Sequence, residues 1–121
     1  MPLVLDVLSI VGKSSSQVMK ILGTPAKEEK SKYGQRKCYK GGDIEIVFIK
    51  GKADWITING LAAVQYSPSA LKAFALDAKS PVYATTDTVM RWKGVNGIKS
   101  VSLFKGNADS CDYLYVKAYT E

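Results

Sequence analysis

Residues 12–25 constrain the fold most strongly, because they contain a helix whose two ends are both marked. Ser14 and Gln17 have the spacing of a capping box, which satisfies the first free amides of a helix. Gly23 stands where a residue of positive φ ends a helix, and Pro25 prevents its continuation. The predicted apolar face of this short amphipathic helix holds Val18, Ile21 and Leu22.

Three strand-like segments follow this helix. They are residues 33–40, 43–50 and 53–59. Two-residue connections, Gly41-Gly42 and Gly51-Lys52, separate them and supply the positive φ that tight hairpin turns require. We therefore expect the first half to continue as an antiparallel meander.

The second half repeats this order of elements after a linker at residues 60–66. Ser67 and Pro68 mark a helix start, and Pro81 lies past its end. Three further strand-like segments follow, at residues 89–93, 98–105 and 111–119.

We therefore predict one α+β domain over residues 1–121, built of two similar halves (about 1–60 and 61–121). Each half is expected to be an α-β-β-β unit. The two units should form one antiparallel sheet with helices packed on one face.

Composition limits the chemistry. The chain has no histidine, so a Ser-His or Cys-His pair is excluded, and its carboxylates show no acid/base spacing. We expect no catalytic residue, metal site or cofactor. Cys38 and Cys111 form no metal-ligand pattern, and the sequence leaves open whether they form a disulfide or are two buried thiols. The net charge of +6 favours acidic partners or anionic surfaces.

The first half resembles a known family. The residues that carry the resemblance are Gly12, Ser14, Val18, Leu22, Gly23 and Pro25, with Tyr39 and the strands to Ile58 following in the expected order. This pattern resembles the SmpA/OmlA (BamE-like) and β-lactamase-inhibitor-protein-like group, and the duplicated plan resembles its tandem, inhibitor-type form. The resemblance covers about half of the chain, and its motif is structural.

The resemblance implies an extracytoplasmic protein, of the cell envelope or secreted, often a lipoprotein, that acts by binding another protein. The second half lacks the Leu-Gly-x-Pro signature, and the chain has no lipobox cysteine. Its first residues also lack the basic start of a secretory signal. We therefore expect membrane association only through a lipid anchor outside these 121 residues.

The last predicted strand carries the candidate binding residues. Tyr113, Tyr115, Lys117 and Tyr119 share one parity, opposite to an aliphatic parity that suits the core. Trp55 likewise alternates with core residues of its strand. Tyrosine and tryptophan offer rigid contact area with a polar tip, which is typical of interface hot spots. These five residues are the predicted contacts of a protein partner, on the open face of the sheet.

A single-stranded nucleic-acid-binding domain is the alternative function. Basic residues accompany the aromatic ones, and a sheet of this kind can stack bases. The basic residues concerned are Arg36, Lys37, Arg91, Lys93 and Lys117. The chain lacks the aromatic signature of RNA-recognition sheets, and its charges are mixed, so protein binding is the preferred prediction.

Overall fold

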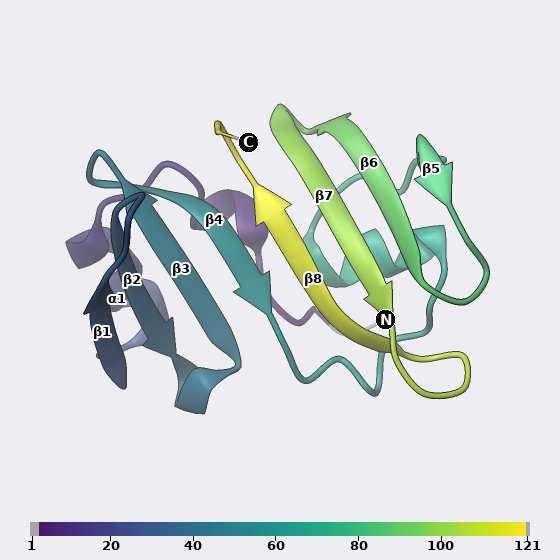
Figure 1. The fold of residues 1–121 in the computed structure, drawn as a ribbon, viewed down its shortest axis with the longest axis horizontal. Coiled ribbons are helices and arrows are strands. Elements are labelled where there is room, and N and C mark those ends of the chain that lie inside the picture. The colour runs from purple at the N-terminus through teal and green to yellow at the C-terminus, as the bar shows by residue number, and fades with distance from the viewer. Residues whose placement is uncertain (1–2, 121) are drawn as a thin grey trace.

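An eight-stranded antiparallel sheet dominates the computed structural model, which describes residues 3–120. Its strand order is β1-β2-β3-β4-β8-β7-β6-β5 (Figure 1). The strands are β1 (Lys27–Lys30), β2 (Gln35–Tyr39), β3 (Ile44–Ile49), β4 (Lys52–Ile58), β5 (Tyr83–Ala84), β6 (Val89–Val95), β7 (Ile98–Lys105) and β8 (Cys111–Lys117). Because β4 pairs with β8, the two halves of the chain meet in the middle of the sheet.

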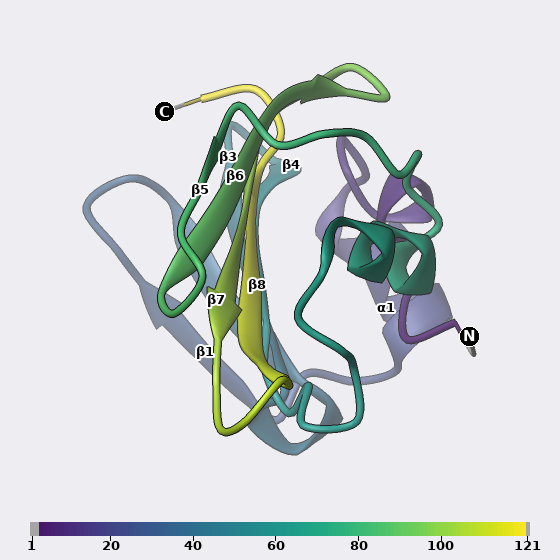
Figure 2. The same ribbon diagram turned by 90° about the vertical axis from the view of Figure 1, so that its right-hand side faces the viewer.

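The helical segments are short. They are α1 (Ser15–Leu22) and the 3₁₀ helices η1 (Val7–Ser9), η2 (Lys40–Gly42) and η3 (Pro68–Phe74). Both α1 and η3 lie on the same side of the sheet (Figure 2). No helix within residues 3–120 has the length and apolar character needed to cross a bilayer.

The predicted fold class is wrong. Each half supplies four strands rather than three, and α1 is the single α-helix of residues 3–120, so the structure does not consist of two α-β-β-β units with helices packed on a face. The segment expected to form a second α-helix is the 3₁₀ helix η3. It stops at Ala75, which has a left-handed backbone (φ 57°) and donates its amide to the carbonyl oxygens of Leu71 and Lys72.

The two unpredicted strands are the outer ones. Strand β1 has the sequence Lys-Glu-Glu-Lys, which is typical of a solvated loop, yet each of its residues has a register partner in β2. Charged residues on an edge strand prevent pairing with other molecules. Strand β5 has only two residues, which pair with Met90 and Arg91.

The predicted helix α1 is confirmed. Ser14 Oγ accepts the Gln17 amide at 3.3 Å, and Gln17 Oε1 accepts the Ser14 amide at 2.9 Å, which completes the capping box. Gly23 ends the helix with φ 89°. Val18 and Leu22 are buried, but Ile21 is 48% exposed and does not belong to the apolar face as predicted.

Two hairpins turn on residue pairs with left-handed backbones. Lys50 and Gly51 connect β3 to β4 with φ 54° and 79°, and Asn96 and Gly97 connect β6 to β7 with φ 50° and 83°. Positive φ at both central residues is the type I′ geometry that matches the twist of paired strands.

The core lies on the side of the sheet that faces α1 and η3. One row of side chains crosses the sheet in register there and is almost fully buried. It consists of Ile46, Ile56, Val116, Val101 and Trp92. Val18 of α1 and Phe74 of η3 belong to the same buried cluster, so both halves share one apolar core.

Asp54 of β4 anchors the end of the chain. Its side chain is buried, and it accepts the amides of Tyr119 (2.9 Å) and Thr120 (3.2 Å) and the hydroxyl of Thr120 (2.6 Å). The adjacent Trp55 donates its indole N–H to the Thr120 carbonyl oxygen at 2.8 Å. The segment after β8 is therefore held by two neighbouring side chains of β4.

We expect Asp54→Ala to lower the free energy of unfolding by about 2 kcal/mol, because it leaves three donors without their charged acceptor. Urea unfolding followed by circular dichroism measures this change. Asp112→Ala, which removes an exposed carboxylate from β8, is the matched control and should have little effect. Equal stability of the two variants would contradict the anchoring role.

Candidate functional site

The face opposite the core, called the open face here, carries two rows of side chains that cross the sheet in register. The first row is Arg36, Val47, Trp55, Lys117, Ser100 and Lys93. The second row is Cys38, Glu45, Thr57, Tyr115, Ser102, Arg91 and Tyr83. Residues in neighbouring positions of a row have Cβ atoms about 5 Å apart, so each row is a continuous line of contacts.

The middle of the open face is an aromatic centre, defined as Tyr33, Trp55, Tyr115 and Lys117. The Lys117 ammonium lies 5.3 Å from the centroid of the Trp55 ring and 5.5 Å from that of Tyr115. Tyr33, from the β1–β2 hairpin, places its ring 4.9 Å from Trp55. A cation that lies over two ring faces is attracted by both.

The predicted contact residues do not all lie together. Trp55, Tyr115 and Lys117 belong to the aromatic centre. Tyr113 precedes Tyr115 by two residues on β8, and its ring stacks on that of Phe104 with the ring centroids 4.3 Å apart. Tyr119 is separate from them, because β8 ends at Lys117 and Asp54 holds the following segment. A Cβ atom at Gly12 would lie 2.5 Å from the Tyr119 hydroxyl, so this tyrosine packs against the loop before α1.

A groove of about 650 Å³ adjoins the aromatic centre and extends over β5 to β8. Its lining combines cationic, hydroxyl and aromatic side chains and contains no carboxylate. The lining residues are Val82, Tyr83, Arg91, Lys93, Ser100, Ser102, Phe104, Tyr115 and Lys117, together with Trp92, which belongs to the core and is only 1% exposed. Ligand sites of this size commonly combine an apolar wall with a few polar groups.

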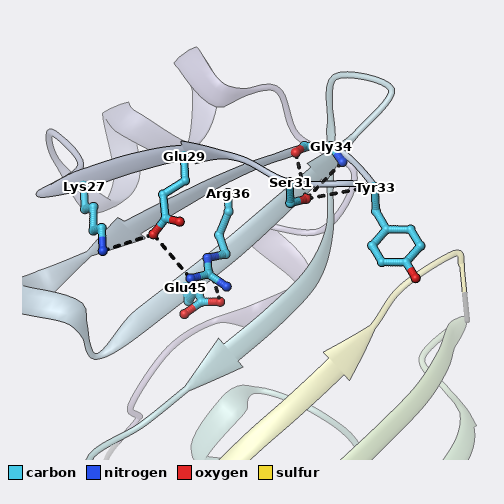
Figure 3. Close-up of polar contacts among 7 residues, drawn as sticks. All are labelled: Lys27, Glu29, Ser31, Tyr33, Gly34, Arg36 and Glu45. Carbon is cyan, nitrogen blue, oxygen red and sulfur yellow. Dashed lines mark hydrogen bonds and ion pairs between the residues drawn. The ribbon is translucent and has the colours of Figure 1, made fainter.

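Charge is distributed unequally over the open face. The four ion pairs found within residues 3–120 all connect side chains of β1, β2 and β3. Three of them lie on the open face, and the fourth, between Lys37 and Glu28, lies on the side of α1, where Lys37 also donates to Ser15 Oγ at 2.6 Å. Glu29 contacts both Lys27 (3.1 Å) and Arg36 (3.3 Å), and Arg36 also reaches Glu45 at 3.4 Å, whereas Tyr33 points away from this cluster (Figure 3). The open-face cations of these strands, Lys27 and Arg36, are therefore paired with carboxylates locally.

The cations of the groove have no such partners within the described chain. Arg91, Lys93 and Lys117 take part in none of these ion pairs. The Arg91 guanidinium lies 6.0 Å from the centroid of the Tyr83 ring, and the Lys117 ammonium lies over the rings of Trp55 and Tyr115. The part of the open face over β5–β8 is consequently electropositive, while the part over β1–β3 is balanced.

Tyr115 keeps its proton at neutral pH. Burial raises the pKa of its phenol, and the negative charges of Glu45 and Asp54 raise it further. The hydroxyl at the border of the groove is therefore a hydrogen-bond donor as well as an acceptor.

The two cysteines are free thiols. Cys38 is on β2 and Cys111 begins β8, with β3 and β4 between them. Three strand spacings amount to roughly 14 Å, whereas a disulfide requires Cα atoms within about 7 Å. The disulfide considered from the sequence is thus not formed in this fold. No group of three His, Cys, Asp or Glu side chains within residues 3–120 is arranged to hold a metal ion.

The sequence did not indicate that Tyr33, Ser100, Ser102 and Phe104 belong to this site. It also did not indicate that Arg91 and Lys93 lie near Lys117. One signal was available, because Arg91 and Lys93 flank the buried Trp92 and so must point to the opposite face. Their proximity to Lys117 depends on the order β8-β7-β6, which no local pattern gives.

No protein-family model matches this chain, and neither does any curated protein or solved structure. The resemblance to the SmpA/OmlA and inhibitor-protein group therefore stays a prediction.

Proposed function

We propose that this protein is a non-catalytic binding module that holds a segment of another protein against the open face of its sheet. The observation that carries this proposal is the aromatic centre, in which the Lys117 ammonium lies over the rings of Trp55 and Tyr115. This centre belongs to the open face, and α1 and η3 lie on the other side of the sheet (Figure 2). Tryptophan, tyrosine and basic side chains are the residues that dominate protein interfaces.

The contacts within the aromatic centre suit it to binding. Tyr33 and Lys117 both contact Trp55, so the ring is held in place before a partner arrives. A side chain that is ordered in the free protein loses little conformational entropy on binding. The family resemblance suggests the same role together with an extracytoplasmic location, and both are included in the proposal.

Site-specific photocross-linking tests the proposed face. Thr57 is a suitable attachment point, because it is half-buried on the second row beside Tyr115. Replacing Thr57 with p-benzoylphenylalanine should give a cross-linked polypeptide of defined mass in an extract of the source cells. Replacing Met19, an exposed residue of α1, is the matched control and should not give that product.

Trp55→Ala in the Thr57 cross-linker background should reduce the product at least about tenfold, because truncating a hot-spot tryptophan commonly costs 2 kcal/mol or more of binding free energy. Cross-linking of equal yield from Thr57 and Met19, or a yield unaffected by Trp55→Ala, would contradict the proposal. Products that consist only of nucleic acid would support the alternative function.

The alternative, binding of single-stranded nucleic acid, is favoured by one observation: three cations without ion-pair partners adjoin aromatic side chains in the groove. It predicts oligonucleotide affinity that falls steeply with salt, since phosphate contacts release counterions.

A further inference from the structure

We infer that the groove over β5–β8 selects an acidic partner segment, bound in an extended conformation along β7 with its carboxylates on Arg91, Lys93 and Lys117. This inference rests on the proposed function and specifies the chemistry of the partner.

The groove follows β7 because side-chain length varies across the three neighbouring strands. Ser100 and Ser102 of β7 form a low floor. On the β8 side they face Lys117 and Tyr115, and on the β6 side they face Lys93 and Arg91. Two short residues between two pairs of long ones leave a channel that is parallel to the strand.

The channel has a bulky aromatic pair at one end and fits a short segment. Phe104 is the next residue of β7 on the open face, and Tyr113 stacks on it with ring planes 13° apart. From Ser100 to Phe104 the strand advances about 13 Å. An extended peptide of four or five residues has the same length.

Charge complementarity determines which segment fits. The walls contribute a cation at Arg91, at Lys93 and at Lys117, while the floor contributes two hydroxyl groups. No acidic side chain lines the channel, and none of these cations belongs to an ion pair within residues 3–120. Carboxylates placed along the channel would gain charge-assisted hydrogen bonds without breaking any internal pair.

The aromatic rings favour a peptide over nucleic acid. Base stacking requires exposed ring faces, but of the rings that line the channel Tyr115 has the Lys117 ammonium over it, and Phe104 already stacks on Tyr113. These two rings therefore serve as walls of the channel more readily than as stacking platforms.

Binding of simple polyanions to the purified protein tests this inference. The probes are a fluorescent random copolymer of glutamate and tyrosine, the corresponding copolymer of lysine and tyrosine, and a dT oligonucleotide of similar length. Anisotropy is measured at low and at physiological salt. We expect the glutamate copolymer to bind, with an affinity that decreases with salt, and the lysine copolymer not to bind.

A charge-reversed variant locates the site. Arg91→Glu combined with Lys93→Glu should weaken binding of the glutamate copolymer at least tenfold. The matched control is Lys72→Glu combined with Lys99→Glu, which makes the same change in net charge at two exposed residues outside the groove. It should change the affinity less than about threefold, through the long-range effect of net charge.

Each outcome is decisive. Equal weakening in both variants, or no binding of the glutamate copolymer at low salt, overturns the acidic-segment inference. If the Thr57 cross-link to a polypeptide persists in that case, the proposed function stands without it. Tighter binding of the oligonucleotide, lost in the charge-reversed variant, overturns both in favour of single-stranded nucleic acid.

Discussion

Trp92→Ala should lower the free energy of unfolding by about 3–5 kcal/mol, the largest stability change that we expect from a single substitution in this chain. Trp92 is 1% exposed and ends the buried row that crosses the sheet. Its indole N–H donates to the carbonyl oxygen of Lys79 at 2.9 Å, which ties the segment before β5 to the core. Truncation removes this bond and leaves a cavity, and urea unfolding followed by far-ultraviolet circular dichroism measures the loss.

Trp55 provides the matched control, because it is a tryptophan of the same sheet on the opposite face. Trp55→Ala should cost less than half as much stability, since the side chain is only partly buried. Trp92→Phe should fall between the two, because it keeps most of the ring volume but loses the hydrogen bond. Equal losses in the two alanine variants would contradict the assignment of Trp92 to the core and Trp55 to the binding face.

Local patterns predicted the elements whose determinants are local. The capping box of Ser14 and Gln17 specifies where α1 begins, and Gly23 specifies where it ends. The apolar alternation of Ile44, Ile46 and Phe48 identified β3 in the same way. Each of these signals requires only a few consecutive residues, so the chain sequence contains the complete information.

Elements that depend on a distant partner were predicted poorly. Strand β1 has no apolar residue, and it is a strand because β2 supplies hydrogen-bonding groups beside it. The position of β8 between β4 and β7 joins residues more than fifty positions apart, such as Trp55 and Lys117. This pairing creates the aromatic centre, and the pairing of β7 with β6 creates the channel, so the candidate site is a product of topology.

The alternation expected for a strand does not extend to Tyr119, because the buried Asp54 of the neighbouring strand binds the backbone there. Its parity matches Tyr113 and Tyr115, which suggested a continuous stripe. The Asp54 carboxylate accepts hydrogen bonds from the amides of Tyr119 and Thr120, and β8 ends before these two residues. Alternation therefore holds only as far as the ladder continues, and a side chain on the neighbouring strand decides where it stops.

The fold predicts a large difference in reactivity between its two thiols. Burial raises the pKa of Cys111 from an ordinary value near 9.0 to about 11, and the residue is 2% exposed. Two pKa units correspond to about a hundredfold less thiolate at neutral pH, and the thiolate is the reactive form. Cys38 is only half-buried, on the open face. Dithionitrobenzoate should therefore modify Cys38, the more accessible thiol, much faster than Cys111.

The pH dependence and two single-cysteine variants make this expectation specific. Because the folded protein holds the neutral thiol of Cys111, its contribution to stability is present below about pH 9 and is lost as the pH rises toward 11. The slow reaction should accelerate over that range, remain in Cys38→Ser and disappear in Cys111→Ser. Two fast thiols would contradict the burial of Cys111. Fewer than two thiols in unfolded, unreduced protein would contradict the separation of Cys38 and Cys111 by β3 and β4.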